Sequence, residues 1–89
     1  MAFLFVWYKR VVKMDVVVII ALSNTVKVYT DNVQDAAPLE ELLGQRGYEP
    51  AGETLWLQLL PTPARAVAEA NHLARTLRRR GYRVVTRLL

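Results

Sequence analysis

The chain has no cysteine, one histidine and one serine, and these shortages exclude most catalytic and metal-binding arrangements. Among its 89 residues, His72 is the only histidine and Ser23 the only serine. Disulfides and thiolate sites are excluded, and one histidine cannot supply a two-histidine metal site within one chain. A Ser–His–Asp triad would need Ser23, in a predicted turn, and His72, in the middle of a predicted helix. We therefore predict no enzymatic activity, no cofactor and no metal site.

Phosphate-binding loops and reactive carboxylate pairs are also missing. At least three of the four glycines are explained by predicted turns and helix ends rather than by a glycine-rich loop. Asp31 with Asp35 fits a loop and a helix cap, and Glu40 with Glu41 fits the first turn of a helix. These carboxylates are therefore interpreted as structural.

No hydrophobic run is long enough to cross a membrane. Phe3–Tyr8 and Val16–Leu22 are apolar, but charged residues separate them, and a spanning helix needs about 20 apolar residues. A secretory signal places its basic residues before the apolar run, whereas here they follow Phe3–Tyr8. The sequence predicts a cytoplasmic protein without a membrane span. Met14 is an alternative start, which would make residues 1–13 dispensable.

A weak internal repeat organises the rest of the chain. Leu43–Tyr48 and Leu77–Tyr82 both end in Arg-Gly-Tyr, with glycine placed to stop a helix and tyrosine to open a strand. A strand-like run precedes each helix, at Val26–Thr30 and at Leu55–Leu60. The first predicted helix covers about residues 36–46, with Asp35 as its cap. The second predicted helix starts at Pro63, with Thr62 as its cap.

This order predicts an α/β (α+β) fold with the ferredoxin-like β-α-β-β-α-β topology over residues 25–89. Such a domain is a two-layer sandwich, with an antiparallel sheet and both helices on one face. Residues 1–24 are predicted to be an N-terminal β extension of this single domain. Within it, Val16–Ile20 is β-branched without alternation, which indicates a strand covered on both faces.

Charge divides the chain into three parts. The net charge of +4 combines basic ends, 1–30 and 64–89, with an acidic middle at 31–63. Two interpretations remain open: the acidic and basic parts neutralise each other in the fold, or the basic part serves a partner.

The basic residues near the C-terminus are concentrated at the end of the second helix and along the last strand. Six arginines fall within thirteen residues: Arg75, Arg78, Arg79, Arg80, Arg83 and Arg87. If Leu55, Leu57 and Leu59 face the helices together with Val26 and Val28, the opposite sheet face carries Lys27, Tyr29 and Trp56. Aromatic residues rimmed by cations on a sheet are typical of modules that stack nucleic-acid bases.

The competing interpretation is that the N-terminal residues or a second subunit cover this face. Phe3, Phe5, Trp7 and Tyr8 belong to an apolar run that is too long to remain exposed on a small monomer. The leading prediction is thus a non-enzymatic interaction or assembly module that forms a homo-oligomer, first of all a dimer, through its sheet and these residues. The alternative is a small basic nucleic-acid-binding protein.

Overall fold

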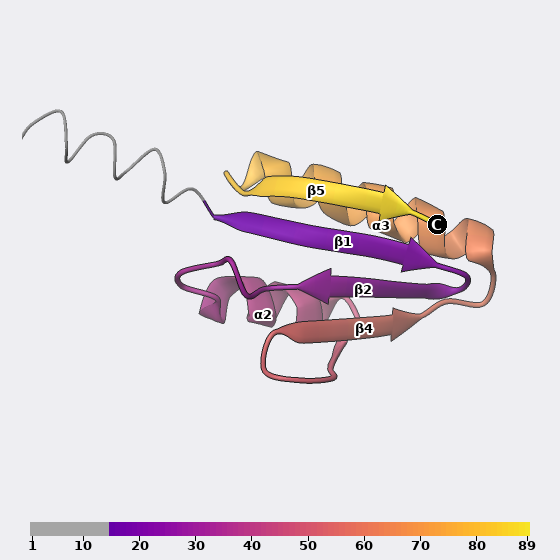
Figure 1. The fold of residues 1–89 in the computed structure, drawn as a ribbon, viewed down its shortest axis with the longest axis horizontal. Coiled ribbons are helices and arrows are strands. Elements are labelled where there is room, and N and C mark those ends of the chain that lie inside the picture. The colour runs from indigo at the N-terminus through magenta and orange to yellow at the C-terminus, as the bar shows by residue number, and fades with distance from the viewer. Residues whose placement is uncertain (1–14) are drawn as a thin grey trace, which may run out of the picture.

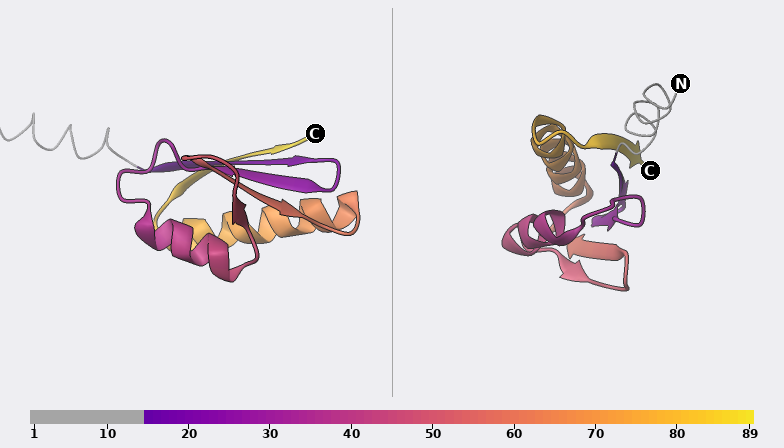
Figure 2. Two further views of the ribbon diagram at one scale, coloured as in Figure 1. Left: turned by 90° about the horizontal axis from the view of Figure 1, so that it is seen from below. Right: turned by 90° about the vertical axis from the view of Figure 1, so that its left-hand side faces the viewer.

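The computed structural model describes residues 15–89, which form a five-stranded sheet with two helices on one of its faces (Figures 1 and 2). The predicted self-association residues Phe3, Phe5, Trp7 and Tyr8 lie outside the described residues. The elements in chain order are β1 (Val16–Leu22), β2 (Thr25–Tyr29), α2 (Ala37–Gln45), β3 (Glu49–Pro50), β4 (Leu55–Leu59), α3 (Pro63–Arg79) and β5 (Arg83–Leu88).

The sheet has the order β3-β4-β2-β1-β5. β1 is antiparallel to β2 but parallel to β5, while β4 is antiparallel to both β2 and β3. The predicted ferredoxin-like sheet is therefore wrong in two respects, because the sheet is mixed and because β1 is inserted between β2 and β5. The structure is a small mixed α+β domain.

A two-residue turn explains why β1 takes this place. Leu22 pairs with Thr25 across Ser23 and Asn24, so β1 and β2 form a tight hairpin. Ser23 has a positive φ of 54°, as the first loop position of such a hairpin often requires. The hairpin fixes β1 beside β2, and the strand that follows α3 then pairs with β1 rather than with β2.

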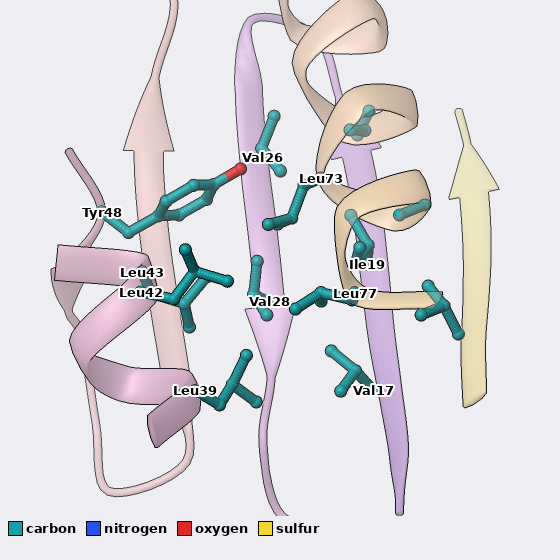
Figure 3. Close-up of a cluster of buried hydrophobic side chains, with 14 of the residues drawn as sticks. Val17, Ile19, Val26, Val28, Leu39, Leu42, Leu43, Tyr48, Leu73 and Leu77 are labelled. Carbon is teal, nitrogen blue, oxygen red and sulfur yellow. The ribbon is translucent and has the colours of Figure 1, made fainter. Parts of the chain in front are cut away.

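The core lies between the helices and one face of the sheet (Figure 3). Val17, Ile19, Val26 and Val28 point from the two central strands into this layer and are fully buried. α3 packs against β1, β2 and β5, while α2 lies over the other half of the sheet. The core residues contributed by the helices include Leu39, Leu43, Leu73 and Leu77.

Both halves of the repeat end their helix in the same way. Gly47 and Gly81 have φ values of +92° and +95°, a conformation that glycine adopts without strain. The Tyr48 N–H donates to the Leu43 carbonyl, and the Tyr82 N–H donates to the Leu77 carbonyl. These bonds form the Schellman arrangement that satisfies the last carbonyls of a helix. The two glycine stops predicted from the sequence are confirmed.

The two helices begin differently. The Thr62 hydroxyl accepts a hydrogen bond from the Arg65 N–H at 3.2 Å, so this predicted cap is confirmed. For α2, the residue at the cap position is Ala36, without a side-chain hydrogen bond, and the predicted Asp35 cap is wrong. Pro38 in the first turn of α2 removes one of the N–H groups that a cap would otherwise have to satisfy.

Candidate functional site

The sheet face opposite the helices is predominantly apolar, and we call it the open face. Two residues that are paired across neighbouring strands point to the same face of the sheet. The strand register and the positions of the buried residues therefore identify the side chains on the open face. Its aliphatic members are Val16, Val18, Ile20, Leu22, Leu55, Leu57, Leu59 and Val85.

No helix or strand of residues 15–89 covers the open face (Figure 2). Leu59 is 75% exposed, and Leu22 and Val85 are each 45% exposed. The other five aliphatic residues are half-buried, because they pack only against their neighbours on the sheet surface. A contiguous patch of this kind on a small protein marks an interaction surface more often than bare surface.

The face predicted for β4 is wrong. Val28 pairs with Trp56 and Val26 pairs with Gln58, so Trp56 and Gln58 share the helix-covered face. Trp56 packs against the core, while Leu55, Leu57 and Leu59 are turned to the open face. The predicted pair of aromatic residues is therefore divided between the two faces.

Lys27 and Tyr29 do lie on the open face, as predicted, opposite Leu57 and Leu55. Both side chains are half-buried. Tyr29 is the only aromatic residue that the described strands place on this face.

The arginines predicted to bind nucleic acid remain exposed at the end of α3 and on β5. Arg83 and Arg87 share the open face with Val85, since they pair with Val16 and Ile20 of β1. Arg75, Arg78, Arg79 and Arg80 belong to the last turns and cap of α3.

None of these six arginines has a carboxylate within 4 Å among residues 15–89. In this part of the chain the only ion pair joins Arg46 to Glu69. The acidic middle and the arginine cluster are thus not joined by an ion pair in the described residues, although Glu41 and Arg80 line the same hollow between α2 and the end of α3.

A cluster of polar side chains joins the end of α2 to the middle of α3. Arg46 Nε and Nη2 donate to the two carboxylate oxygens of Glu69 at 3.2 and 2.8 Å. The Tyr48 hydroxyl donates to Glu69 Oε2 at 2.9 Å. Arg46 Nη2 also lies 3.1 Å from His72 Nδ1, and because arginine can only donate, this nitrogen is the acceptor.

This cluster is built to hold elements together rather than to react. Burial and, after it, the negative charge of Glu69 raise the pKa of the Tyr48 hydroxyl far above its usual range, so Tyr48 remains a donor. The Glu69 carboxylate is occupied by a guanidinium and a phenol, which leaves it poorly placed as a base. Sequence reasoning missed this network, since its members come from the cap of α2, the residue before β3 and α3, and no spacing rule connects them.

The described residues offer no metal site and only shallow hollows. No group of three His, Cys, Asp or Glu side chains between residues 15 and 89 could hold a metal ion. One hollow, of about 380 Å³, lies at the β3–β4 edge and is lined by Gly47, Glu49, Pro50, Ala51, Leu57, Gln58 and Leu59. Glu49 is its only ionisable residue, so the hollow holds no acid–base pair.

None of the described helices is both long and apolar enough to span a membrane. Comparisons with protein-family models, curated proteins and solved structures found no match for this chain.

Proposed function

We propose that this domain is an assembly module that associates with a second copy through the open face of its sheet. The observation that carries the proposal is the uncovered row of aliphatic side chains on the central and edge strands. A two-fold axis would place the same patch on both partners, which is the commonest arrangement among homo-oligomers.

The composition of β1 supports this proposal. Val17, Ile19 and Ala21 face the core, whereas Val16, Val18 and Ile20 face the other side with residues that are just as apolar. Antiparallel sheets with one wet face normally alternate apolar and polar residues. A central strand without that alternation fits a sheet that is covered on both faces.

Small size adds a reason for association. A domain of this length buries only about 60–65% of its unfolded surface, so its stability is marginal. Apolar area removed from water contributes about 25 cal/mol per Å². Covering the open face would therefore stabilise the fold as well as join two copies.

The test is the mass of the full chain in solution. We expect light scattering after size exclusion to give twice the 10.2 kDa chain mass at micromolar concentration. Leu22→Glu with Leu59→Glu should yield a monomer, because burying these two carboxylates in the interface would oppose association. Leu22 is 45% exposed and Leu59 is 75% exposed in the monomer, so the fold should survive.

The matched control places two glutamates on the other side of the molecule. Ala64 and Ala68 are exposed on α3, away from the sheet. Ala64→Glu with Ala68→Glu changes the net charge equally and should leave the dimer intact. A monomeric wild type, or equal dissociation of both variants, would contradict the proposal.

The proposal includes four N-terminal residues on the basis of the sequence alone: Phe3, Phe5, Trp7 and Tyr8. A variant with all four replaced by serine separates their predicted contribution from that of the sheet. If the open face alone joins the copies, this variant remains a dimer that Leu22→Glu with Leu59→Glu still dissociates.

Nucleic-acid binding is the weaker candidate function. The six arginines lack carboxylate partners among residues 15–89, which favours a polyanionic ligand. However, Tyr29 and Trp56 lie on opposite faces of the sheet, so they do not form one surface for base stacking.

A further inference from the structure

β5 forms one outer edge of the sheet, and no described strand pairs with its outer side (Figure 1). The Arg83 N–H donates to the Asp15 carbonyl at 2.9 Å, and the Leu89 N–H donates to the Ala21 carbonyl at 2.8 Å. Backbone groups of alternate residues in a parallel strand point to the same side. Odd-numbered residues therefore bond to β1, while Val84, Thr86 and Leu88 direct their N–H and C=O groups outward.

One of these outward groups already accepts a donor from outside the ladder. Arg78 Nη2 donates to the Val84 carbonyl at 3.2 Å. This contact places a guanidinium at the first outward position of the edge. The Thr86 and Leu88 backbone groups follow it along the strand.

The side chains around this edge are cationic. Arg83 and Arg87 are exposed, lie two residues on either side of Val85, and project to the open face. Neither they nor Arg78 have a carboxylate within 4 Å among residues 15–89. An exposed edge strand is a template for pairing with another strand, and its side chains select the partner.

We infer that the β5 edge binds an extended acidic segment of another protein by strand addition. Residues directly opposite each other on paired strands are about 5 Å apart. Three alternate residues of the added strand would therefore face Arg83, Val85 and Arg87. In the added strand, acidic residues would therefore occupy the first and fifth of five successive positions and an aliphatic residue the third, with any residue between them.

A second copy of this chain does not fit the β5 edge. Antiparallel pairing of two β5 strands would gather four arginines along one seam without a carboxylate between them. The chain's own segment with the required pattern is Asp31–Asp35, but its Val33 is only 8% exposed and belongs to the core. Residues 1–14 contain no acidic residue.

The same arginines could attract nucleic acid, but the edge favours a peptide. A peptide strand uses the outward N–H and C=O groups as well as the cations, whereas single-stranded nucleic acid depends on aromatic stacking. The described strands place only Tyr29 on the open face, and β2 is separated from β5 by β1.

The experiment is a titration of the full-length, ¹⁵N-labelled protein with the peptide Thr-Glu-Thr-Val-Thr-Glu-Thr, followed by NMR. We expect the amide signals of Val84, Thr86 and Leu88 to shift most. The same peptide with glutamine in place of glutamate should bind about tenfold more weakly, since two exposed ion pairs contribute up to about 1 kcal/mol each.

Protein variants separate edge recognition from general charge attraction. Arg83→Gln with Arg87→Gln should weaken binding about tenfold, and Arg87→Gln alone about threefold, whereas the control Arg65→Gln, which matches the single variant in charge change, should weaken it less than about twofold. Thr86→Pro removes one outward N–H but no bond to β1, and proline is tolerated on such edges. This variant should lose the peptide and keep the remaining amide spectrum.

Three results would overturn the inference. They are the absence of shifts at the outward amides with millimolar peptide, equal weakening by Arg87→Gln and Arg65→Gln, and binding of an oligothymidylate but not of the peptide. The inference does not depend on the proposed dimer, because Leu22→Glu with Leu59→Glu tests association by mass and the peptide is followed at the β5 amides.

Discussion

At the scale of single residues, Gly47 and Gly81 have the same conformation but different surroundings. Both occupy the left-handed region that closes a helix. A Cβ on Gly81 would meet nothing within 4 Å, whereas a Cβ on Gly47 would lie 2.9 Å from Gln58 Nε2. That nitrogen donates to the Arg46 carbonyl at 3.1 Å, so moving it breaks a hydrogen bond.

Gly47→Ala should therefore destabilise the fold more than Gly81→Ala. The shared cost of the left-handed backbone is about 1 kcal/mol, and the lost Gln58 bond adds about 1 kcal/mol for Gly47→Ala. Urea unfolding of the two variants measures the difference in the free energy of unfolding. Equal losses would mean that Gln58 finds another partner without cost.

Tyr48 predicts a loss of stability in alkali. Burial and the neighbouring Glu69 raise the pKa of its hydroxyl in the folded protein, while the unfolded value remains about 10. The stabilisation is therefore complete below pH 10 and declines as the pH rises above it, because only the unfolded chain releases the proton. Urea unfolding at pH 9 to about 11 should show this decline.

Tyr48→Phe should be less stable at neutral pH, but its stability should fall less steeply in alkali. Tyr82→Phe is the control, since Tyr82 holds the equivalent position in the second repeat and is half-buried without a bond to a carboxylate. It should keep the wild-type decline. An identical alkaline profile for Tyr48→Phe would show that Tyr48 is not the group responsible.

At the scale of elements, local signals in the sequence located both helices, although not the cap of α2, and failed for the pairing of β1 with β5. Thr62 with Pro63 starts α3, and the Arg-Gly-Tyr segments stop both helices, because caps and glycine stops act over a few residues. The turn at Ser23 and Asn24 is local and places β1 beside β2, but the pairing of β1 with β5 depends on contacts far apart in the chain. No local pattern distinguishes that sheet from a ferredoxin-like one.

The face of β4 shows the same limit in a single strand. Leu55, Leu57 and Leu59 form the more apolar side, so periodicity alone assigns them to the core. The structure instead turns Trp56 and Gln58 inward. Gln58 Nε2 donates to the Arg46 carbonyl, while Gln58 Oε1 is buried without a hydrogen-bond partner among residues 15–89. Because the face of β4 is predicted wrongly, Trp56 is also wrongly assigned to the predicted nucleic-acid surface. The six arginines lie at the end of α3 and on β5, and Tyr29 lies on the open face, as the sequence predicts.

At the scale of the whole molecule, apolar and cationic side chains on the open face respond differently to salt. In the proposed dimer, Lys27, Arg83 and Arg87 of both copies face the same interface, with repulsion between like charges. Salt screens such repulsion, with a Debye length that falls from about 10 Å at 0.1 M to about 3 Å at 1 M. Burial of aliphatic side chains does not depend on this screening.

Raising the salt concentration from about 0.05 to 0.5 M should therefore tighten the dimer. The same change should weaken any complex of the arginines with nucleic acid, because such complexes release counterions on forming. Sedimentation velocity of the wild type over a dilution series at both salt concentrations measures the dissociation constant directly. Lys27→Gln should reduce the salt effect, whereas Arg65→Gln, which changes the net charge equally on the far side of the sheet, should leave it unchanged. A dimer that dissociates as salt rises would instead mean that ion pairs, and not the aliphatic residues of the open face, join the two copies.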